Sequence, residues 1–189
     1  MIREVLARGS RPRGIARPAR IGQCEGVPPD VPLVDVADIV AAAEAVVDAF
    51  GLVARRLLPD AEVHHIGATA LPTGLTKGDV DVNLRIDTEA FARAVDVLRR
   101  HYEPAQEHNW TPTYASFKTD VYPLPLGIQV TVIGSPDDFL LALRDAMRTR
   151  PAILDEYTEC KRRAAAFGPD AYWEAKDTFL RALRSADDE

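Results

Sequence analysis

The chain is poor in cysteine and lacks long apolar runs. Its two cysteines among 189 residues, Cys24 and Cys160, are far apart and in no metal-ligand spacing. This excludes a disulfide framework and a cysteine-based metal centre, and we expect reduced thiols in a cytoplasmic protein. No apolar run approaches the roughly 18 to 20 residues of a membrane helix, so we expect no membrane partner.

Acidic residues outnumber basic ones outside the first 20 residues. That segment holds six arginines against one acid, a net +5 in a chain of net −6, which leaves −11 for the rest. A nucleic-acid-binding face needs clustered cations on the folded body, so we expect no nucleic-acid partner. Proline, glycine and like charge in residues 1–32 predict a disordered extension before a single domain over 33–189.

Apolar periodicity predicts an α/β or α+β domain with a small mixed sheet flanked by helices. The helices before the C-terminal part are expected at Val36–Leu58 and from Thr88 to near His101. Strands are expected at Glu62–Ile66, Asp79–Ile86, Tyr114–Lys118 and Ile128–Ile133. A segment of three helices is expected over residues 136–186, the first opened by Ser135 and Pro136, the others by Pro151 and Pro169.

Two carboxylates stand one residue apart at the head of a predicted strand. Side chains alternate along a strand, so Asp79 and Asp81 share a face with Asn83 and Arg85. Like charges this close repel unless a cation lies between them, and a divalent metal is the usual cation. The pattern indicates metal-assisted phosphate chemistry, with Mg²⁺ as the expected cofactor and Asp79 and Asp81 as its ligands and the catalytic acids.

A glycine upstream of the acids strengthens this interpretation. Gly67 leaves room for backbone N–H groups to approach a phosphate, at a spacing that brings the loop and the acid pair to adjoining strand ends. The alternative is that the two acids lie on a solvated strand face and bind nothing. Trp110, Tyr114 and Phe117 offer a similar choice between a base-stacking platform and the core.

The string from His65 to Pro72, followed by Lys77 and Asp79-Val80-Asp81, resembles the GrpB family of the nucleotidyltransferase superfamily. The C-terminal part is similar to that family at further positions: Phe139, Arg144-Asp145, Pro151, Tyr157, Lys161, Tyr172 and Lys176. The resemblance implies a nucleotidyltransferase-like core with trailing helices. It places a nucleotide or its phosphates near the following residues: Gly67, Ala68, Thr69, Lys77, Arg144, Lys161 and Lys176. His65, Gln129 and Thr131 are expected to line the site.

Two positions depart from the family and superfamily patterns. Many GrpB members have serine where this chain has Ala68, and Thr69 is the nearest substitute hydroxyl. Catalytic superfamily members carry a third acid on a neighbouring strand, where this chain offers Gln129 and Thr131. Asp120 is the one nearby acid.

Two functions of different classes follow from these residues. The first is a Mg²⁺-dependent nucleotidyltransferase that moves a nucleotidyl group from a nucleoside triphosphate to a small-molecule acceptor. The second is a non-catalytic nucleotide- or metabolite-binding module that keeps the fold but lacks the third acid. A third acid within metal-bridging reach of Asp79 and Asp81 would favour the transferase over the binding module. Nothing in the chain selects a toxin-like or drug-resistance transferase, and the oligomeric state is open.

Overall fold

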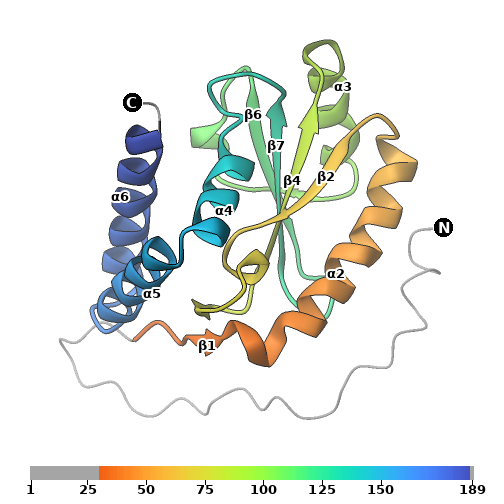
Figure 1. Cartoon of the computed structure of the whole chain (residues 1–189). Helices are drawn as coiled ribbons and strands as arrows, with labels where there is room; N and C mark the ends of the chain where they lie inside the picture. Colours follow the sequence, from red (N-terminus) through yellow and green to blue (C-terminus); the bar gives the residue numbers. More distant parts are fainter. Residues whose placement is uncertain (1–29, 188–189) are drawn as a thin grey trace.

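The computed structural model describes residues 30–187 and confirms a mixed α/β fold, with a central sheet between two groups of helices (Figure 1). The five strands of this sheet have the order β2-β4-β7-β6-β5. Only β4 and β7 run parallel, and the other neighbours are antiparallel. The bounds are β2 Glu62–Ile66, β4 Val80–Ile86, β5 Glu103–Pro104, β6 Tyr114–Thr119 and β7 Leu126–Val132.

Five helices accompany the sheet within the described residues. They are α2 Val36–Leu57, α3 Thr88–Arg99, α4 Leu140–Thr149, α5 Pro151–Ala165 and α6 Pro169–Asp187. A two-stranded ribbon pairs β1, Val34–Asp35, with β3, Leu75–Thr76. The short 3-10 turns η1, Ala68–Ala70, and η2, Glu107–Asn109, complete the described elements.

The alternation along β4 separates an apolar face from a polar one. Val80, Val82, Leu84 and Ile86 are at most 3% exposed and pack with α2 and α3 in the main core. The opposite face carries Asp81 and the polar residues that follow it at every second position, so it cannot join that core. The polar face is therefore the face available for a site.

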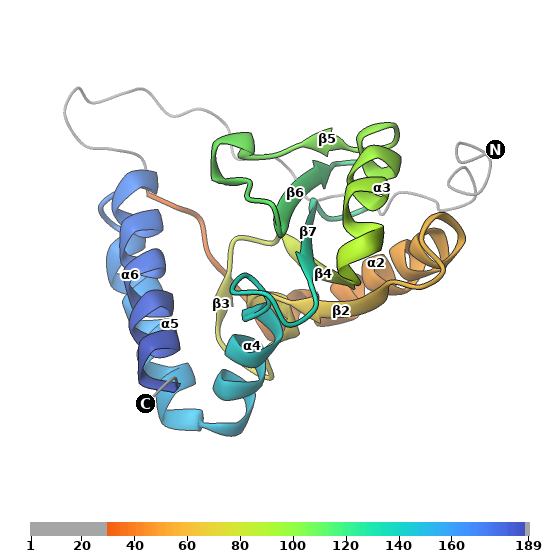
Figure 2. The ribbon, with the colours of Figure 1, turned by 90° about the horizontal axis from the view of Figure 1, so that it is seen from above.

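The three C-terminal helices lie on the polar side, opposite α2 and α3 (Figure 2). A second apolar cluster holds them together, and Leu71 of the loop after η1 belongs to it. Polar contacts add to this attachment: Lys161 Nζ of α5 donates to the backbone oxygen of Leu75 in β3, and Arg144 of α4 donates to His65 O of β2 at 2.8 Å. The helices are thus fixed above the strand ends that carry the acids.

The predicted start of the first C-terminal helix is wrong. The helix begins at Leu140, and the segment from Ser135 forms turns instead. The carboxylates that would serve a helical start are engaged elsewhere: Asp138 accepts from Arg85 at 2.7 Å, and Asp137 accepts from Thr113 at 2.5 Å. Tertiary hydrogen bonds here outweigh a local capping pattern.

The strand Glu62–Ile66 has the predicted bounds, and the boundaries of the other predicted elements differ by at most two residues. The sequence reasoning missed the short strands β1, β3 and β5, which have only two residues each. Within residues 30–187 no helix is long and apolar enough to cross a membrane. Residues 1–29, and with them Cys24 and most of the predicted extension, lie outside the described residues.

Candidate functional site

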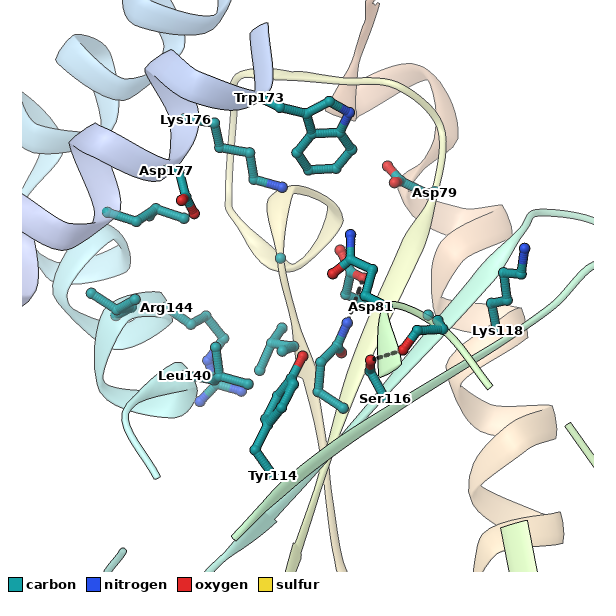
Figure 3. Close-up of a pocket in the computed structure, with 18 of the residues that line it drawn as sticks. Asp79, Asp81, Tyr114, Ser116, Lys118, Leu140, Arg144, Trp173, Lys176 and Asp177 are labelled. Carbon is teal, nitrogen blue, oxygen red and sulfur yellow. Dashed lines mark hydrogen bonds between the residues drawn. The ribbon is translucent and has the colours of Figure 1, made fainter. Parts of the chain in front are cut away.

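A pocket of about 580 Å³ lies between the polar face of the sheet and helices α4 and α6 (Figure 3). This volume falls within the range of about 300–1,000 Å³ for small-molecule sites. Six residues predicted from the sequence line it, and they come from both sides: Gly67, Asp79, Asp81, Gln129, Arg144 and Lys176. The pocket therefore joins the acid pair to cations supplied by the C-terminal helices.

The carboxylate of Asp81 is closely flanked by two glycines. A Cβ at Gly67 would fall 2.5 Å from Asp81 Oδ2, and a Cβ at Gly127 of β7 would fall 2.6 Å from Oδ1. Gly67 also has φ +73°, a conformation that side chains disfavour. The backbone on either side thus approaches the carboxylate in a way that larger residues would block.

Burial raises the pKa of Asp81, and the neighbouring charge of Asp79 acts in the same direction. Lys176, the hydrogen bond from Gln129 and Lys77 oppose this shift without cancelling it. A raised pKa means that the folded protein supplies too little positive charge to stabilise the ionised carboxylate. A cation bound beside Asp81 would stabilise the ionised form.

Gln129 occupies the position on β7 where a third acid was sought. Its Nε2 donates to Asp81 Oδ1 at 3.1 Å, while its Oε1 is buried and has no hydrogen-bond partner among the described residues. Asp120 is exposed beyond the end of β6 and does not line the pocket. Across residues 30–187, no cluster of three or more acidic, histidine or cysteine side chains is arranged to hold a metal ion.

The donors that face the pocket fit one Mg²⁺ ion rather than a fully protein-built metal cage. Mg²⁺ is commonly held by one or two carboxylates, with water and substrate phosphates as the other ligands. Asp79 and Asp81 supply two carboxylates, and the unpartnered Oε1 of Gln129 is a further oxygen on the same face of the sheet. The remaining ligands would have to come from the substrate and water.

Two lysines lie close to the acids and share one aromatic ring. Lys77 Nζ is 3.2 Å from Asp79 Oδ2 and 4.3 Å from the centroid of the Trp173 ring. Lys176 Nζ is 4.7 Å from the same centroid, and Figure 3 shows its ammonium directed into the pocket. Lys176 is the cation of the pocket that makes no salt bridge within the described part of the chain.

Arg144 is held in a fixed orientation at the pocket wall. Its Nη1 donates to the backbone oxygen of His65 at 2.8 Å, and its Nε and Nη2 both donate to Asp145 Oδ1, at 2.8 and 2.7 Å. The guanidinium therefore adds positive charge to the pocket without much freedom to move.

The remaining predicted residues do not line the pocket. His65 Nε2 lies 3.0 Å from Thr69 Oγ1, which donates to Asp79 O at 3.4 Å, so these side chains brace the loop around the acids. Burial and the nearby Arg144 lower the pKa of His65 to about 4, which keeps the ring neutral near pH 7. Ala68 lies in the turn between them.

Two further predicted residues are buried in structural contacts. Lys161 is 2% exposed, its ammonium lies 4.2 Å from the Tyr157 ring centroid, and burial lowers its pKa to about 8. Thr131 is fully buried and accepts a hydrogen bond from Asn83 Nδ2 at 3.0 Å. Neither side chain lines the pocket, although the sequence placed both with the site.

Among the aromatics weighed from the sequence, Trp110 and Phe117 pack against each other at 5.2 Å. Phe117 and Tyr114 both line the pocket, but Phe117 is only 1% exposed and belongs to the core. Sequence reasoning missed Trp173. It lies on the same face of α6 as Lys176, Asp177 and Leu180, all of which line the pocket. This spacing of three, four and seven residues was the available signal.

The fold and pocket define a mixed α/β protein with an acid pair beneath a three-helix segment. A family model described as GrpB protein matches residues 37–185. The chain therefore belongs to the GrpB family. It is also 26% identical over 128 residues to a UPF0157 protein of Vibrio cholerae serotype O1, covering 67% of this chain and 68% of that protein.

A solved structure agrees with this assignment at the level of the fold. The conserved protein GrpB from Enterococcus faecalis is 19% identical, with a TM-score of 0.57 over 80% of this chain and 98% of that one. The Cid1 poly(U) polymerase bound to MgATP is 11% identical, with a TM-score of 0.45 over 66% of this chain and 44% of that one.

Proposed function

We propose that this protein binds a nucleoside triphosphate together with one Mg²⁺ ion at Asp79 and Asp81. The observation that carries the proposal is the joining of these two acids with Lys176 and Arg144 in one pocket of small-molecule size. A triphosphate needs positive charge, and both a metal and fixed side-chain cations provide it. No third acid joins the pair among residues 30–187, and this favours binding over turnover as the primary function.

Each pocket residue has a distinct part in this proposal. Asp79 and Asp81 would hold the Mg²⁺ ion, which neutralises phosphate charge when bound. Lys176 would move toward a phosphate oxygen, because an ammonium on a flexible stem acts as an adjustable point charge. Arg144, fixed by Asp145 and His65 O, would offer charge without reorganisation. Gly67 would let the backbone approach the phosphates.

Nucleotidyl transfer to a small-molecule hydroxyl is the second candidate. It is favoured by a pocket that extends from the acids to apolar residues of α4 and α6, such as Leu140 and Leu180, where an acceptor has room. The acceptor oxygen would bond to the α-phosphorus, pyrophosphate would leave, and the hydroxyl proton would pass to water. Positioning and charge neutralisation supply most of the catalysis in such reactions.

Calorimetry with ATP tests the binding proposal. We expect ATP with Mg²⁺ to bind the native chain and to bind at least about tenfold more weakly in EDTA or to the Asp79→Asn/Asp81→Asn double variant. Asp120→Asn removes an exposed acid outside the pocket and is the matched control. Unchanged ATP binding in the double variant would overturn the metal assignment.

Pyrophosphate release separates the two candidates. Incubation with ATP, Mg²⁺ and a panel of small hydroxyl compounds should yield pyrophosphate only if nucleotidyl transfer occurs. Release that disappears in the double variant would establish turnover.

Within the same proposal, the protein acts in the cytoplasm on small molecules rather than on nucleic acid.

A further inference from the structure

Trp173 is an exposed aromatic residue inside the pocket. Six large hydrophobic side chains are well exposed among the described residues, and Trp173, at 44%, is the one of them that lines this pocket. Its ring adjoins the acid pair through Lys77, which contacts both the ring and Asp79. An exposed indole at that place is a surface for a flat ligand group.

The charges around the ring limit the kind of ligand. Lys77 and Lys176 lie 4.3 and 4.7 Å from the ring centroid, and Arg144 lines the same pocket. Two cations on one aromatic ring, and a third on the wall of the same pocket, suit a ligand that combines several negative charges with a planar ring. A nucleotide has both parts, whereas inorganic polyphosphate has only the first.

We propose that Trp173 is the nucleobase subsite of this pocket, on which the base of the bound nucleotide stacks. The inference rests on the proposed function, since it places a second part of the same ligand. The lysines cover the ring when no phosphate is present, and they leave its face as they turn toward the phosphates. Because every base has a π-face, this subsite accepts purines and pyrimidines with little preference.

Tyr114 is the other aromatic side chain of the pocket with access to a ligand, but it is less suited to this role. In the view of Figure 3 it lies across the pocket from Trp173, with Asp81 between them. It extends from β6 on the sheet side, and within residues 30–187 no lysine or arginine stacks on its ring. It therefore lacks the pair of lysines that lies on the Trp173 ring.

Tryptophan fluorescence tests the subsite, because the chain has only two tryptophans. In a Trp110→Phe background, Trp173 is the sole emitter. We expect ATP or UTP with Mg²⁺ to quench or shift its emission, and tripolyphosphate with Mg²⁺ to have a clearly smaller effect. Calorimetry on Trp173→Leu in the otherwise native chain should show roughly tenfold weaker ATP binding, with tripolyphosphate binding within twofold of native. Trp173→Phe should restore most of the affinity.

The outcomes separate a failure of the Trp173 subsite from a failure of the proposed nucleotide site. ATP binding that is native in Trp173→Leu overturns the subsite and leaves the proposed function standing. An equal loss of ATP and tripolyphosphate binding also overturns it, because the ring would then act only by holding the lysines. The absence of any binding heat with ATP overturns the proposed function and the subsite together. If Trp110→Phe fails to fold, the calorimetric comparison decides alone.

Discussion

Gln129 donates a hydrogen bond from Nε2 to Oδ1 of Asp81 across the parallel strands β7 and β4. The contact is diagonal, because the residue directly opposite Asp81 is Gly127 and the residue opposite Gln129 is Asn83. A neutral amide therefore touches the half-buried carboxylate where a third acid would make the site more strongly anionic. In the proposed function, the charge at this position would set how strongly the pocket attracts a divalent cation.

Replacing Gln129 by glutamate should convert the acid pair into a three-acid site. We expect Gln129→Glu to bind Mn²⁺ about tenfold more tightly, equivalent to about 1.4 kcal/mol, in titrations followed by electron paramagnetic resonance. In metal-free buffer it should lower the free energy of unfolding by roughly 1–2 kcal/mol, because a second negative charge is placed beside the half-buried carboxylate of Asp81. Asn109→Asp adds the same charge at an exposed position and should change neither property. Unaltered Mn²⁺ affinity would refute the role of Gln129.

Removing the charge of Asp81 should stabilise the protein at neutral pH. Burial raises the pKa of Asp81 in the folded chain, so ionisation of this carboxyl favours unfolding as the pH rises above 3.8, its ordinary value. We expect Asp81→Asn to raise Tm at pH 7, by about 2–4 °C for each kcal/mol gained in the free energy of unfolding. This gain should shrink as the pH falls toward 3.8. Thermal unfolding across this pH range measures the effect. A lower Tm at pH 7 would contradict it.

Acid should weaken the loop that surrounds the acid pair through His65. Its pKa is lowered from 6.5 to about 4, so the folded chain resists protonation. The stability contributed by the neutral ring is present above pH 6.5 and is lost as the pH falls toward 4. Between pH 4 and 6.5, unfolding of the native chain lets this ring take up a proton. We expect His65→Gln to lower the number of protons taken up on unfolding by up to one in this window. His108→Gln, at an exposed position, should retain the native slope; if both variants behave alike, His65 is not responsible.

Lys161 should matter for stability more than for nucleotide binding. Its buried ammonium donates to Leu75 O and rests on Tyr157, and Lys161 itself does not line the pocket. We expect Lys161→Met, which keeps most of the bulk, to lower the free energy of unfolding by about 1–3 kcal/mol because Leu75 O loses its partner. Lys176→Met should instead weaken ATP binding with little effect on unfolding. Urea titration and calorimetry on both variants provide the comparison, and the reverse pattern would refute this division of roles.

The fold was largely predictable because periodic apolar patterns determine which face of each element is buried. The strand around Asp81 shows this, since its alternation places the acids opposite the core. The start at Leu140 was not predictable, because the carboxylates of Asp137 and Asp138 bind residues distant in sequence. Local patterns carry no information about such partners.

The candidate site was predictable on the sheet side and only in part on the helix side. Gly67, Asp79 and Asp81 are close in sequence, so spacing alone brings them together. Lys161 and Lys176 both lie on C-terminal helices, yet only Lys176 lines the pocket, because helix packing turns Lys161 toward Leu75. The spacing of Trp173 and Lys176 placed them on one helical face, but which way that face points was not predictable from the sequence.

The two glycines that flank Asp81 set different limits on how this family can diverge. Gly127 adopts an ordinary backbone conformation, so what excludes a side chain there is chiefly the carboxylate 2.6 Å from its would-be Cβ. Gly67 is constrained both by that carboxylate and by its positive φ. A lineage that lost Asp81 would therefore be free to vary at 127 while still keeping glycine at 67. Covariation between positions 81 and 127 would trace the presence of the acid through evolution.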